Sequence, residues 1–354
     1  MPRIFAYLLT GLALLFGAVS AAEKQNIALP GDVFAPPASE NSANTLPGML
    51  AVALTPRNFP EHTPADTDAM FKRGAELGRG AVFIYQWSDP ALAAIPRVLL
   101  AAARENGLTP IVGLSPTTLD QARRELDLPA ALRRPGVSFD DADVRRAFVA
   151  SAEELAKLEP PYLCLGTEIN FYAVNGARAY VAFAAAYKEA YRAVKKISPA
   201  TRVFVSFQYE FMRLLDHKEP EKIEEHRKLI DIFRPELDLI AITTYPVDAY
   251  ADPGKMPSNY YARLHEYLHA GDTVMVMEAG WPSAGQGSPE QQRAFVRRLP
   301  ELLADVKPVA TAWSMLHDVK VGVFGADLAT TGLYTRDGEA KPAAAAWKAL
   351  GEKR

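Results

Sequence analysis

Apolar and polar positions along the chain change their pattern at about residue 49. From there onward, short runs rich in apolar and β-branched residues alternate with longer segments in which apolar residues recur at helical spacing. The short runs predict strands at residues 49–55, 81–86, 110–114, 162–167, 202–207, 237–244, 273–278 and 309–316. The longer segments predict helices, for example at residues 91–105, 142–158, 177–197, 221–233, 259–269 and 289–304, and a last helix at 341–350.

This alternation predicts the fold class. Eight strands, most of them followed by a helix, within about 300 residues fit one closed (β/α)8 TIM barrel, an α/β fold, better than two open sheets. A doubly wound sheet would carry a glycine-rich phosphate-binding turn after its first strand, and the Leu-Thr-Pro-Arg-Asn sequence at residues 54–58 is not such a turn. Residues 49–354 contain no linker sequence, so we expect a single barrel domain.

The residues before the barrel predict an export signal and a tether. Arg3 supplies a positive start, residues 4–16 are almost wholly apolar and residues 18–22 are small, so residues 1–22 predict a cleaved signal peptide. An uncleaved membrane anchor is the alternative, because the apolar stretch approaches the length of a short span. Residues 23–48, rich in Pro, Ala, Ser and Asn, predict a loosely attached arm. We therefore expect a periplasmic or secreted protein with no stable membrane insertion after signal cleavage.

The composition is that of an ordinary globular protein, with 49% hydrophobic residues and a formal net charge of −3. Lys and Arg number 39 against 42 Asp and Glu, so we expect no nucleic-acid partner. Cys164 is the single cysteine and cannot close an intramolecular disulfide; its apolar run predicts a buried core position. We expect no cofactor.

Carboxylates and aromatic rings gather at the ends of the predicted strands. In a (β/α)8 barrel the loops that follow the strands converge on one face, where active sites lie. In chain order, the strand ends carry Trp87 and Asp89, Glu168 and Asn170, Gln208, Tyr209 and Glu210, Tyr245, Glu278 and Trp281, and Trp313, His317 and Asp318. Glu168 and Glu278 come directly after buried-type runs. Since an unpaired carboxylate at a buried rim is costly, both are candidates for chemistry.

Two facing carboxylates with aromatic surfaces beside them are what cleavage of a glycosidic bond requires. One carboxyl group protonates the leaving oxygen, and the other attacks the anomeric carbon or activates water. Aromatic faces stack on sugar rings, and Trp87 and Trp281 are the best candidates for this role. From spacing alone, the alternative that both glutamates only cap loops or pair with arginine stays open.

Two motifs resemble known glycosidases. The run Glu278-Ala279-Gly280-Trp281-Pro282-Ser283 resembles the nucleophile segment of the family 17 β-1,3-glucanase-like glycoside hydrolases. The run Gly166-Thr167-Glu168 resembles the acid/base segment of the wider clan A of (β/α)8 glycosidases. The resemblance covers the strand ends of residues 49–350 and is specific only at residues 278–283.

The resemblance implies a retaining mechanism and a role for each matching residue. Clan members place the acid/base on strand four and the nucleophile on strand seven, which implies these roles for Glu168 and Glu278. A clan tyrosine that hydrogen-bonds the nucleophile matches Tyr245, and a strand-eight tryptophan matches Trp313. Such chemistry asks for a raised pKa on the acid and hydrogen bonds on the nucleophile. The implied partner is a carbohydrate substrate, a β-linked, glucan-like polysaccharide or oligosaccharide.

The acid/base segment departs from the clan pattern at one position. The clan usually has Asn before this Glu, where it bonds the sugar 2-hydroxyl, and this chain has Thr167. Thr167 itself or Asn170 could hold that hydroxyl, the substrate could differ at that carbon, or activity could be reduced. Gln208 and His317 are further candidates for binding hydroxyls. Thr167 also favours an alternative function, a carbohydrate-binding barrel without catalysis in polysaccharide export or processing.

A competing motif lies at residues 265–269. His265, Glu266 and His269 satisfy the H-E-x-x-H pattern, which on a helix places two imidazoles on one face with a glutamate as base and suggests a zinc peptidase. Here the helix is short and both histidines fall beside its apolar stripe, toward solvent. No further zinc-ligand motif follows, so we expect no metal at this motif.

Overall fold

The computed structural model describes residues 46–118, 123–215, 220–320 and 328–351. Within these residues the strands are β1 Met49–Ala53, β2 Gly80–Gln86, β3 Thr109–Ser115, β4 Tyr162–Cys164, β5 Arg202–Phe204, β6 Ser206–Gln208, β7 Ile240–Thr244, β8 Val274–Ala279 and β9 Ala310–Trp313. The helices are α1 Pro64–Leu77, α2 Ile95–Glu105, α3 Ala142–Ala156, α4 Ala177–Ile197, α5 Tyr209–Leu215, α6 Pro220–Asp231, α7 Pro289–Leu302 and α8 Pro342–Gly351.

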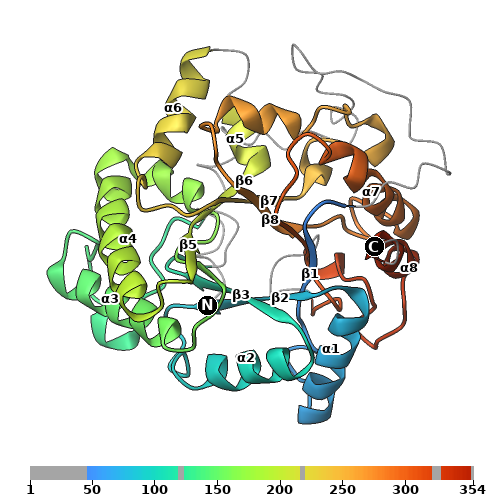
Figure 1. Ribbon diagram of the computed structural model, residues 1–354, viewed down its shortest axis with the longest axis horizontal. Coiled ribbons are helices and arrows are strands. Elements are labelled where there is room, and N and C mark those ends of the chain that lie inside the picture. The colour runs from blue at the N-terminus through green and yellow to red at the C-terminus, as the bar shows by residue number, and fades with distance from the viewer. Residues whose placement is uncertain (1–45, 119–122, 216–219, 321–327, 352–354) are drawn as a thin grey trace, which may run out of the picture.

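The strands form one all-parallel sheet that closes into a barrel. Its order is β5-β4-β3-β2-β1-β9-β8-β7-β6, and the two outermost members, β5 and β6, are separated in the chain by Val205 alone. The two short strands are therefore one interrupted strand, at the position of the predicted strand 202–207, and the ring has eight members. Figure 1 shows the helices arranged around this ring. The predicted (β/α)8 barrel is confirmed.

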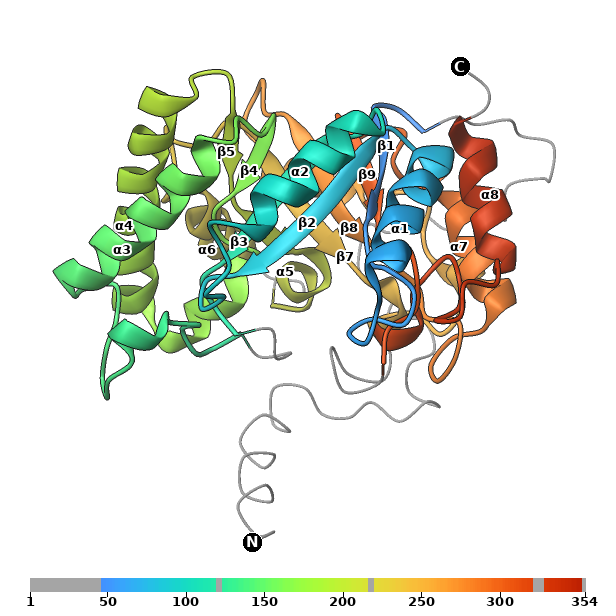
Figure 2. The ribbon, with the colours of Figure 1, turned by 90° about the horizontal axis from the view of Figure 1, so that it is seen from below.

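Two apolar clusters hold the barrel together, one inside the ring and one between the ring and the helices. The inner cluster takes alternate residues of the strands, for example Ala51, Val82 and Met275. The outer cluster takes the residues between them, such as Val52 and Val276, together with the buried faces of the helices. Seen from the side, the strands lie between α3 and α4 at one end and α7 and α8 at the other (Figure 2). The period of two along each strand decides which cluster a side chain joins.

One predicted helix is wrong. Residues 259–269 contain only the short 3-10 helix η5 Ala262–Glu266, with turns on both sides. The consecutive side chains of Tyr260 and Tyr261 are both buried, and their rings pack at a centroid distance of 4.8 Å. Adjacent side chains on an α-helix point about 100° apart, and an amphipathic helix buries only one stripe. Such a helix would not bury two consecutive tyrosines this completely.

The predicted signal peptide, residues 1–22, lies outside the described residues, as does most of the predicted arm at 23–48. Those two expectations stay predictions. Among the described residues, no helix combines the length and apolar character needed to cross a membrane.

Phe148 on α3 offers a test of the outer cluster. Its buried ring packs against Trp87, Phe139 and Phe183 at centroid distances of 5.3, 5.4 and 6.0 Å. Phe148→Ala should lower the free energy of unfolding by ~3–5 kcal/mol, because it removes buried contacts and leaves a cavity. Urea denaturation measures the loss. Val98 is 67% exposed on α2, so Val98→Ala should change stability by less than about 0.5 kcal/mol, and an equal effect of the two substitutions would contradict the packing described.

Candidate active site

Glu278 faces the inside of the barrel because β8 is irregular. Between Val276 and Glu278 the chain advances by two residues while the neighbouring β7 advances by one. This extra residue is a β-bulge, which changes the side of the sheet that the following side chains face. Met277 belongs to the inner cluster and Ala279 to the outer one, so the bulge directs Glu278 inward as well.

One oxygen of Glu278 is held by two hydroxyl groups. Tyr245 Oη donates to Glu278 Oε2 at 2.8 Å, and Ser314 Oγ donates to the same oxygen at 3.2 Å. Oε1 accepts no hydrogen bond from any described residue. Gly280 makes room for the tyrosine, since a Cβ at this position would lie 2.5 Å from a carbon of the Tyr245 ring. The contact between Tyr245 and Glu278 that the family resemblance implies is therefore present.

Glu168 lies where the chain turns from β4 into the 3-10 helix η2 Ile169–Asn175. Its φ of 50° is in the left-handed region, which residues other than glycine seldom occupy. Its backbone N–H donates to Ser206 Oγ at 2.9 Å, and its Oε1 accepts from Thr243 Oγ1 at 2.6 Å. Thr243 on β7 is the register partner of Glu278 on β8, so the side chain that donates to Glu168 comes from the residue beside Glu278 in the sheet.

Arg123 is a site residue that the sequence analysis missed. It comes from the connection between β3 and α3, residues 116–141, and its Nε is ion-paired with Glu168 Oε2. The guanidinium charge also lowers the pKa of Glu278, and its side chain is 11% exposed. Two buried carboxylates call for a nearby cation, which points to an arginine in one of the loops. Nothing in the sequence distinguishes Arg123 from its neighbour Arg124.

The two carboxyl groups share one proton near neutral pH. Burial and, next, the charge of Glu168 raise the pKa of Glu278 to about 7, against the opposing effects of its hydrogen bonds and of Arg123. Carboxylates that repel each other titrate as a pair, so below about pH 7 the pair keeps a proton. Glu278, the expected nucleophile, is thus the carboxyl group whose pKa is raised, while Glu168 has an arginine as its counter-charge.

The side chains of Asn170 and Gln208 make hydrogen bonds within the protein and do not face a ligand site. The Asn170 side chain donates to Gln208 O at 2.9 Å and accepts from Gln208 N–H at 2.8 Å. The Gln208 side chain donates to Glu210 Oε2 at 2.7 Å and accepts from Phe211 N–H. Both side chains are buried, and their amide groups fasten η2 to β6 and the start of α5. This corrects the expectation that they bind sugar hydroxyls.

The two predicted stacking platforms and the tryptophan that matches the clan position are buried in the outer cluster. Trp87, Trp281 and Trp313 are each at most 1% exposed. Trp87 Nε1 donates to Ser151 Oγ on α3 at 3.1 Å, and Trp313 Nε1 donates to Thr331 O at 2.8 Å. A ring enclosed by protein offers no face to a sugar, which corrects the stacking role expected for Trp87 and Trp281 and the substrate contact considered for Trp313.

Thr167 and His317 are also enclosed. The Thr167 hydroxyl is fully buried, has no hydrogen-bond partner among the described residues and faces Gly113 of β3. His317 follows β9 and contacts Thr55, which follows β1. Its backbone N–H donates to Thr55 Oγ1 at 2.9 Å, and its Nδ1 lies 2.7 Å from Thr55 O. Burial lowers the pKa of His317. Neither side chain lies open to a substrate, which corrects the ligand roles considered for them.

The zinc motif does not lie on an α-helix. His265 belongs to η5, which ends at Glu266, and His269 lies beyond it, so the two side chains do not share an α-helical face. His269 Nε2 lies 3.2 Å from Asp231 Oδ1, and Glu266 is ion-paired with Arg263. Among the described residues, no group of three or more His, Cys, Asp or Glu side chains could hold a metal ion.

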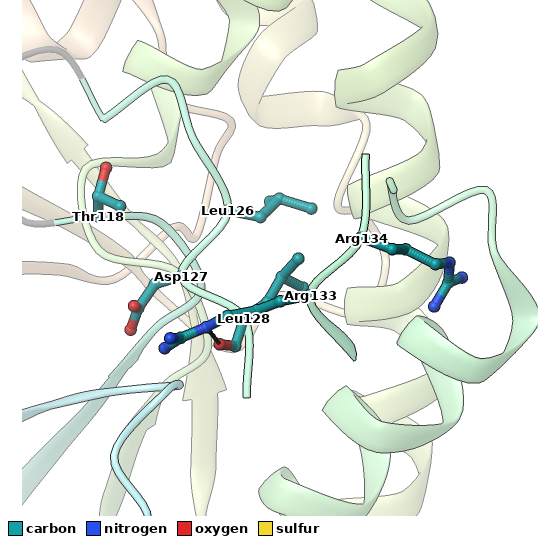
Figure 3. Close-up of a pocket in the computed structure, with 6 residues that line it drawn as sticks. All are labelled: Thr118, Leu126, Asp127, Leu128, Arg133 and Arg134. Carbon is teal, nitrogen blue, oxygen red and sulfur yellow. Dashed lines mark hydrogen bonds between the residues drawn. The ribbon is translucent and has the colours of Figure 1, made fainter. Parts of the chain in front are cut away.

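A cavity of about 290 Å³ lies in the connection between β3 and α3. Figure 3 shows its lining, which consists of Thr118, Leu126, Asp127, Leu128, Arg133 and Arg134. Arg133 Nε donates to Leu128 O across one side at 3.0 Å. The lining includes neither glutamate, so this cavity is distinct from the carboxylate pair although the same connection carries Arg123.

Comparison by sequence finds no relative. No protein-family model matches the chain, and no curated protein matches its sequence. Comparison by structure finds several glycoside hydrolases. A GH5_18 protein of Streptomyces cattleya, in complex with Manβ1-4GlcNAc, matches with a TM-score of 0.65 and 18% identity over 85% of this chain and 79% of that one.

Two further solved structures extend the comparison. An exo-β-1,4-mannosidase from an Opitutaceae bacterium matches with a TM-score of 0.66 and 13% identity, over 88% of this chain and 61% of that one. A family 39 glycoside hydrolase from Bacteroides cellulosilyticus matches with a TM-score of 0.59 and 14% identity, over 88% and 64% of the two chains. The chain has the barrel fold of these glycoside hydrolases. The resemblance to family 17 at residues 278–283 stays a prediction.

The raised pKa of Glu278 gives stability a pH dependence of known sign. Between pH 4.5 and about 7 the folded state keeps a proton that the unfolded chain releases, so the free energy of unfolding falls as pH rises. Glu278→Gln removes the titrating group and with it this pH-dependent loss of stability. The free energy of unfolding of the variant minus that of wild type should increase by ~1–3 kcal/mol from pH 4.5 to about pH 8. Urea denaturation at both pH values measures the gain.

Asp66→Asn is the matched control. Hydrogen bonds from Arg57 and Thr63 hold the pKa of Asp66 well below its usual range, so its contribution is lost only as pH falls below about 4. The stability difference between Asp66→Asn and wild type should therefore stay constant over the window in which the Glu278→Gln difference rises. A constant difference for both variants would contradict the pKa assigned to Glu278.

Proposed function

We propose that this protein is a retaining glycoside hydrolase acting on a β-linked polysaccharide or oligosaccharide. The observation that carries the proposal is the pair of buried glutamates, Glu168 after β4 and Glu278 on β8, whose charges interact with each other and with that of Arg123. Active sites of (β/α)8 barrels lie at the carboxyl ends of the strands, where both glutamates occur. The glycoside hydrolase fold of the structural neighbours supports the same reaction class.

The hydrogen bonds of Glu278 suit a nucleophile. Tyr245 and Ser314 hold Oε2, and Oε1 is left without a partner among the described residues, so Oε1 is the oxygen that attacks the anomeric carbon. Attack forms a glycosyl ester on Glu278 while Glu168 donates a proton to the leaving oxygen. Water then cleaves the ester as Glu168 takes a proton from it, and the anomeric configuration is retained.

The shared proton must change place before the bond breaks. Cleavage needs Glu168 protonated and Glu278 ionised, whereas the unliganded protein has the proton on Glu278. A sugar that enters between the two carboxyl groups displaces Arg123 from Glu168. Loss of this counter-charge favours transfer of the proton from Glu278 to Glu168, so substrate binding itself prepares the reactive form.

The neighbours broaden the substrate class beyond glucans. The family 17 resemblance implies a glucan-like polymer, while one structural neighbour was solved with Manβ1-4GlcNAc and another is an exo-β-1,4-mannosidase. We therefore include β-linked mannose and N-acetylglucosamine among the sugars to test. The predicted signal at residues 1–22 supports action in the periplasm or outside the cell, and N-terminal sequencing of the exported protein tests that location.

Glu278→Ala should abolish release of reducing ends by the mature protein. The assay uses β-1,3-, β-1,4- and β-1,6-linked glucans together with β-1,4-mannan and Manβ1-4GlcNAc. Loss of the nucleophile should lower the rate by at least about 1,000-fold, because no glycosyl ester forms. The Val98→Ala variant is the control for handling and should match wild type. A Glu278→Ala variant as active as wild type would exclude the assignment.

The pH dependence of kcat/KM should report the shared proton. Activity should fall above about pH 7, where the pair loses the proton that the leaving group needs. Because the charge of Arg123 lowers the pKa of Glu278, Arg123→Gln should move this alkaline limb to higher pH. Arg133→Gln changes an arginine of the same connection that lines the separate cavity, and its limb should stay in place. An unmoved limb in Arg123→Gln would show that Arg123 is not coupled to the pair.

The second candidate is a carbohydrate-binding barrel without catalysis. Two observations favour it. The Thr167 hydroxyl, at the position where clan A has an asparagine, faces Gly113 inside the barrel, and Arg123 is ion-paired with Glu168, the expected acid. This function predicts saturable oligosaccharide binding with no release of reducing ends from any polymer. The same substrate panel separates the two functions.

A further inference from the structure

A third buried carboxylate, Glu210, lies behind Tyr245. It belongs to the first turn of α5, and each of its oxygens accepts two hydrogen bonds. Oε1 accepts from Thr244 Oγ1 at 2.5 Å and from Tyr260 Oη at 2.8 Å. Oε2 accepts from Gln208 Nε2 at 2.7 Å and from the backbone N–H of Tyr245 at 3.0 Å. This carboxylate joins the ends of β6 and β7 to the segment before η5.

Tyr245 is held from two sides at this point. Glu210 fixes its backbone N–H, and Gly280 lies directly beneath its ring, where a Cβ would come within 2.5 Å of a ring carbon. With the main chain and the ring both held, the phenol hydroxyl points toward Glu278 Oε2, to which it donates a hydrogen bond. An error of about 1 Å in such a group is enough to lose a catalytic hydrogen bond.

We propose that Glu210 is a positioning residue, which fixes the backbone of Tyr245 so that the phenol hydroxyl donates to Glu278 Oε2. It touches neither substrate nor the reacting atoms. Its effect on turnover rests on the proposed glycosidase function, but its effect on Glu278 does not. A carboxylate with 3% exposure is costly to bury, and an apolar side chain would fill the same space at lower cost, so its four hydrogen bonds have a purpose beyond packing.

The test measures the pKa of Glu278 with and without Glu210. Around Glu278 lie the charges of Glu168 and Arg123 and the hydroxyls of Tyr245 and Ser314. The hydrogen bond from Tyr245 lowers this pKa, so Glu210→Gln should raise it above about 7 if Tyr245 shifts. If Glu210 acted only through its negative charge, its removal would lower the pKa of Glu278 instead. The direction of the change therefore distinguishes positioning from a charge effect.

The measurement needs no substrate. In each background, the free energy of unfolding is compared with and without Glu278→Gln across pH, and the midpoint of the difference gives the pKa of Glu278. Burial raises the pKa of Glu210 itself to about 7, in the same window, but this titration is present with and without Glu278→Gln and cancels within each pair. Glu210→Gln should raise the midpoint, and in a Tyr245→Phe background it should no longer do so, because the phenol hydroxyl through which it acts is gone. Glu210→Asp retracts the carboxylate by one methylene and should also raise the midpoint, which keeps the test available if Glu210→Gln does not fold.

Asp238→Asn is the matched control for a purely structural loss. Asp238 precedes β7 at its other end and accepts hydrogen bonds from Tyr191 Oη at 2.8 Å and Val203 N–H at 2.7 Å. Its replacement should lower stability and leave the midpoint for Glu278 unchanged. An unchanged or lowered midpoint in Glu210→Gln and Glu210→Asp would overturn the proposal.

Activity separates this proposal from the proposed function. If a substrate is found, Glu210→Gln should reduce kcat more than it changes KM, because Tyr245 acts on the nucleophile through its hydrogen bond to Glu278. A raised midpoint without turnover of any polymer supports the positioning role while the glycosidase assignment fails. Turnover with an unmoved midpoint supports the glycosidase assignment while the positioning role fails.

Discussion

The bulge in β8 is the irregularity on which the candidate site depends. In a regular strand Glu278 would face the helices with Val274 and Val276, in the outer cluster. Because of the extra residue, two consecutive side chains face inward. Met277 packs in the inner cluster, and Glu278 follows it toward the carboxyl end of the strand. Every contact that makes this glutamate useful, from Tyr245 and Ser314 to the charge of Arg123, follows from that change of side.

Placing carboxylates at the end of a closed barrel creates an electrostatic problem, which the protein solves differently for each. Glu168 has a cation, Glu278 has two hydroxyl donors and a pKa raised to about 7, and Glu210, whose pKa burial also raises to about 7, has four hydrogen bonds. A ligand can displace the cation from Glu168, and Oε1 of Glu278 accepts no hydrogen bond from any described residue. The hydrogen bonds of Glu210 come from the fold itself. This division supports reaction chemistry at the first pair and a fixed scaffold behind it.

The sequence was sufficient to predict the barrel and to single out the two glutamates at its strand ends, but not the contacts around them. Glu168 and Glu278 could be found because they come directly after apolar strands, and Tyr245 because it matches a clan position. Trp87 and Trp313 also come at strand ends, but they continue the outward series, Phe83 and Tyr85 on β2 and Thr311 on β9. Counting alternate positions along these two strands would have placed both rings against the helices. Burial, not motif, was the missing criterion.

Arg123 shows why the rest of the site escapes sequence reasoning. Its connection carries no periodicity, and its contact with Glu168 joins residues that are 45 positions apart. The predicted sugar ligands on the strands, by contrast, prove to be buried or engaged with the backbone. Under the proposed function, sugar recognition therefore falls to groups on the loops around the pair. The strand ends then supply the carboxyl groups, and the connections between strands and helices determine which sugar reaches them.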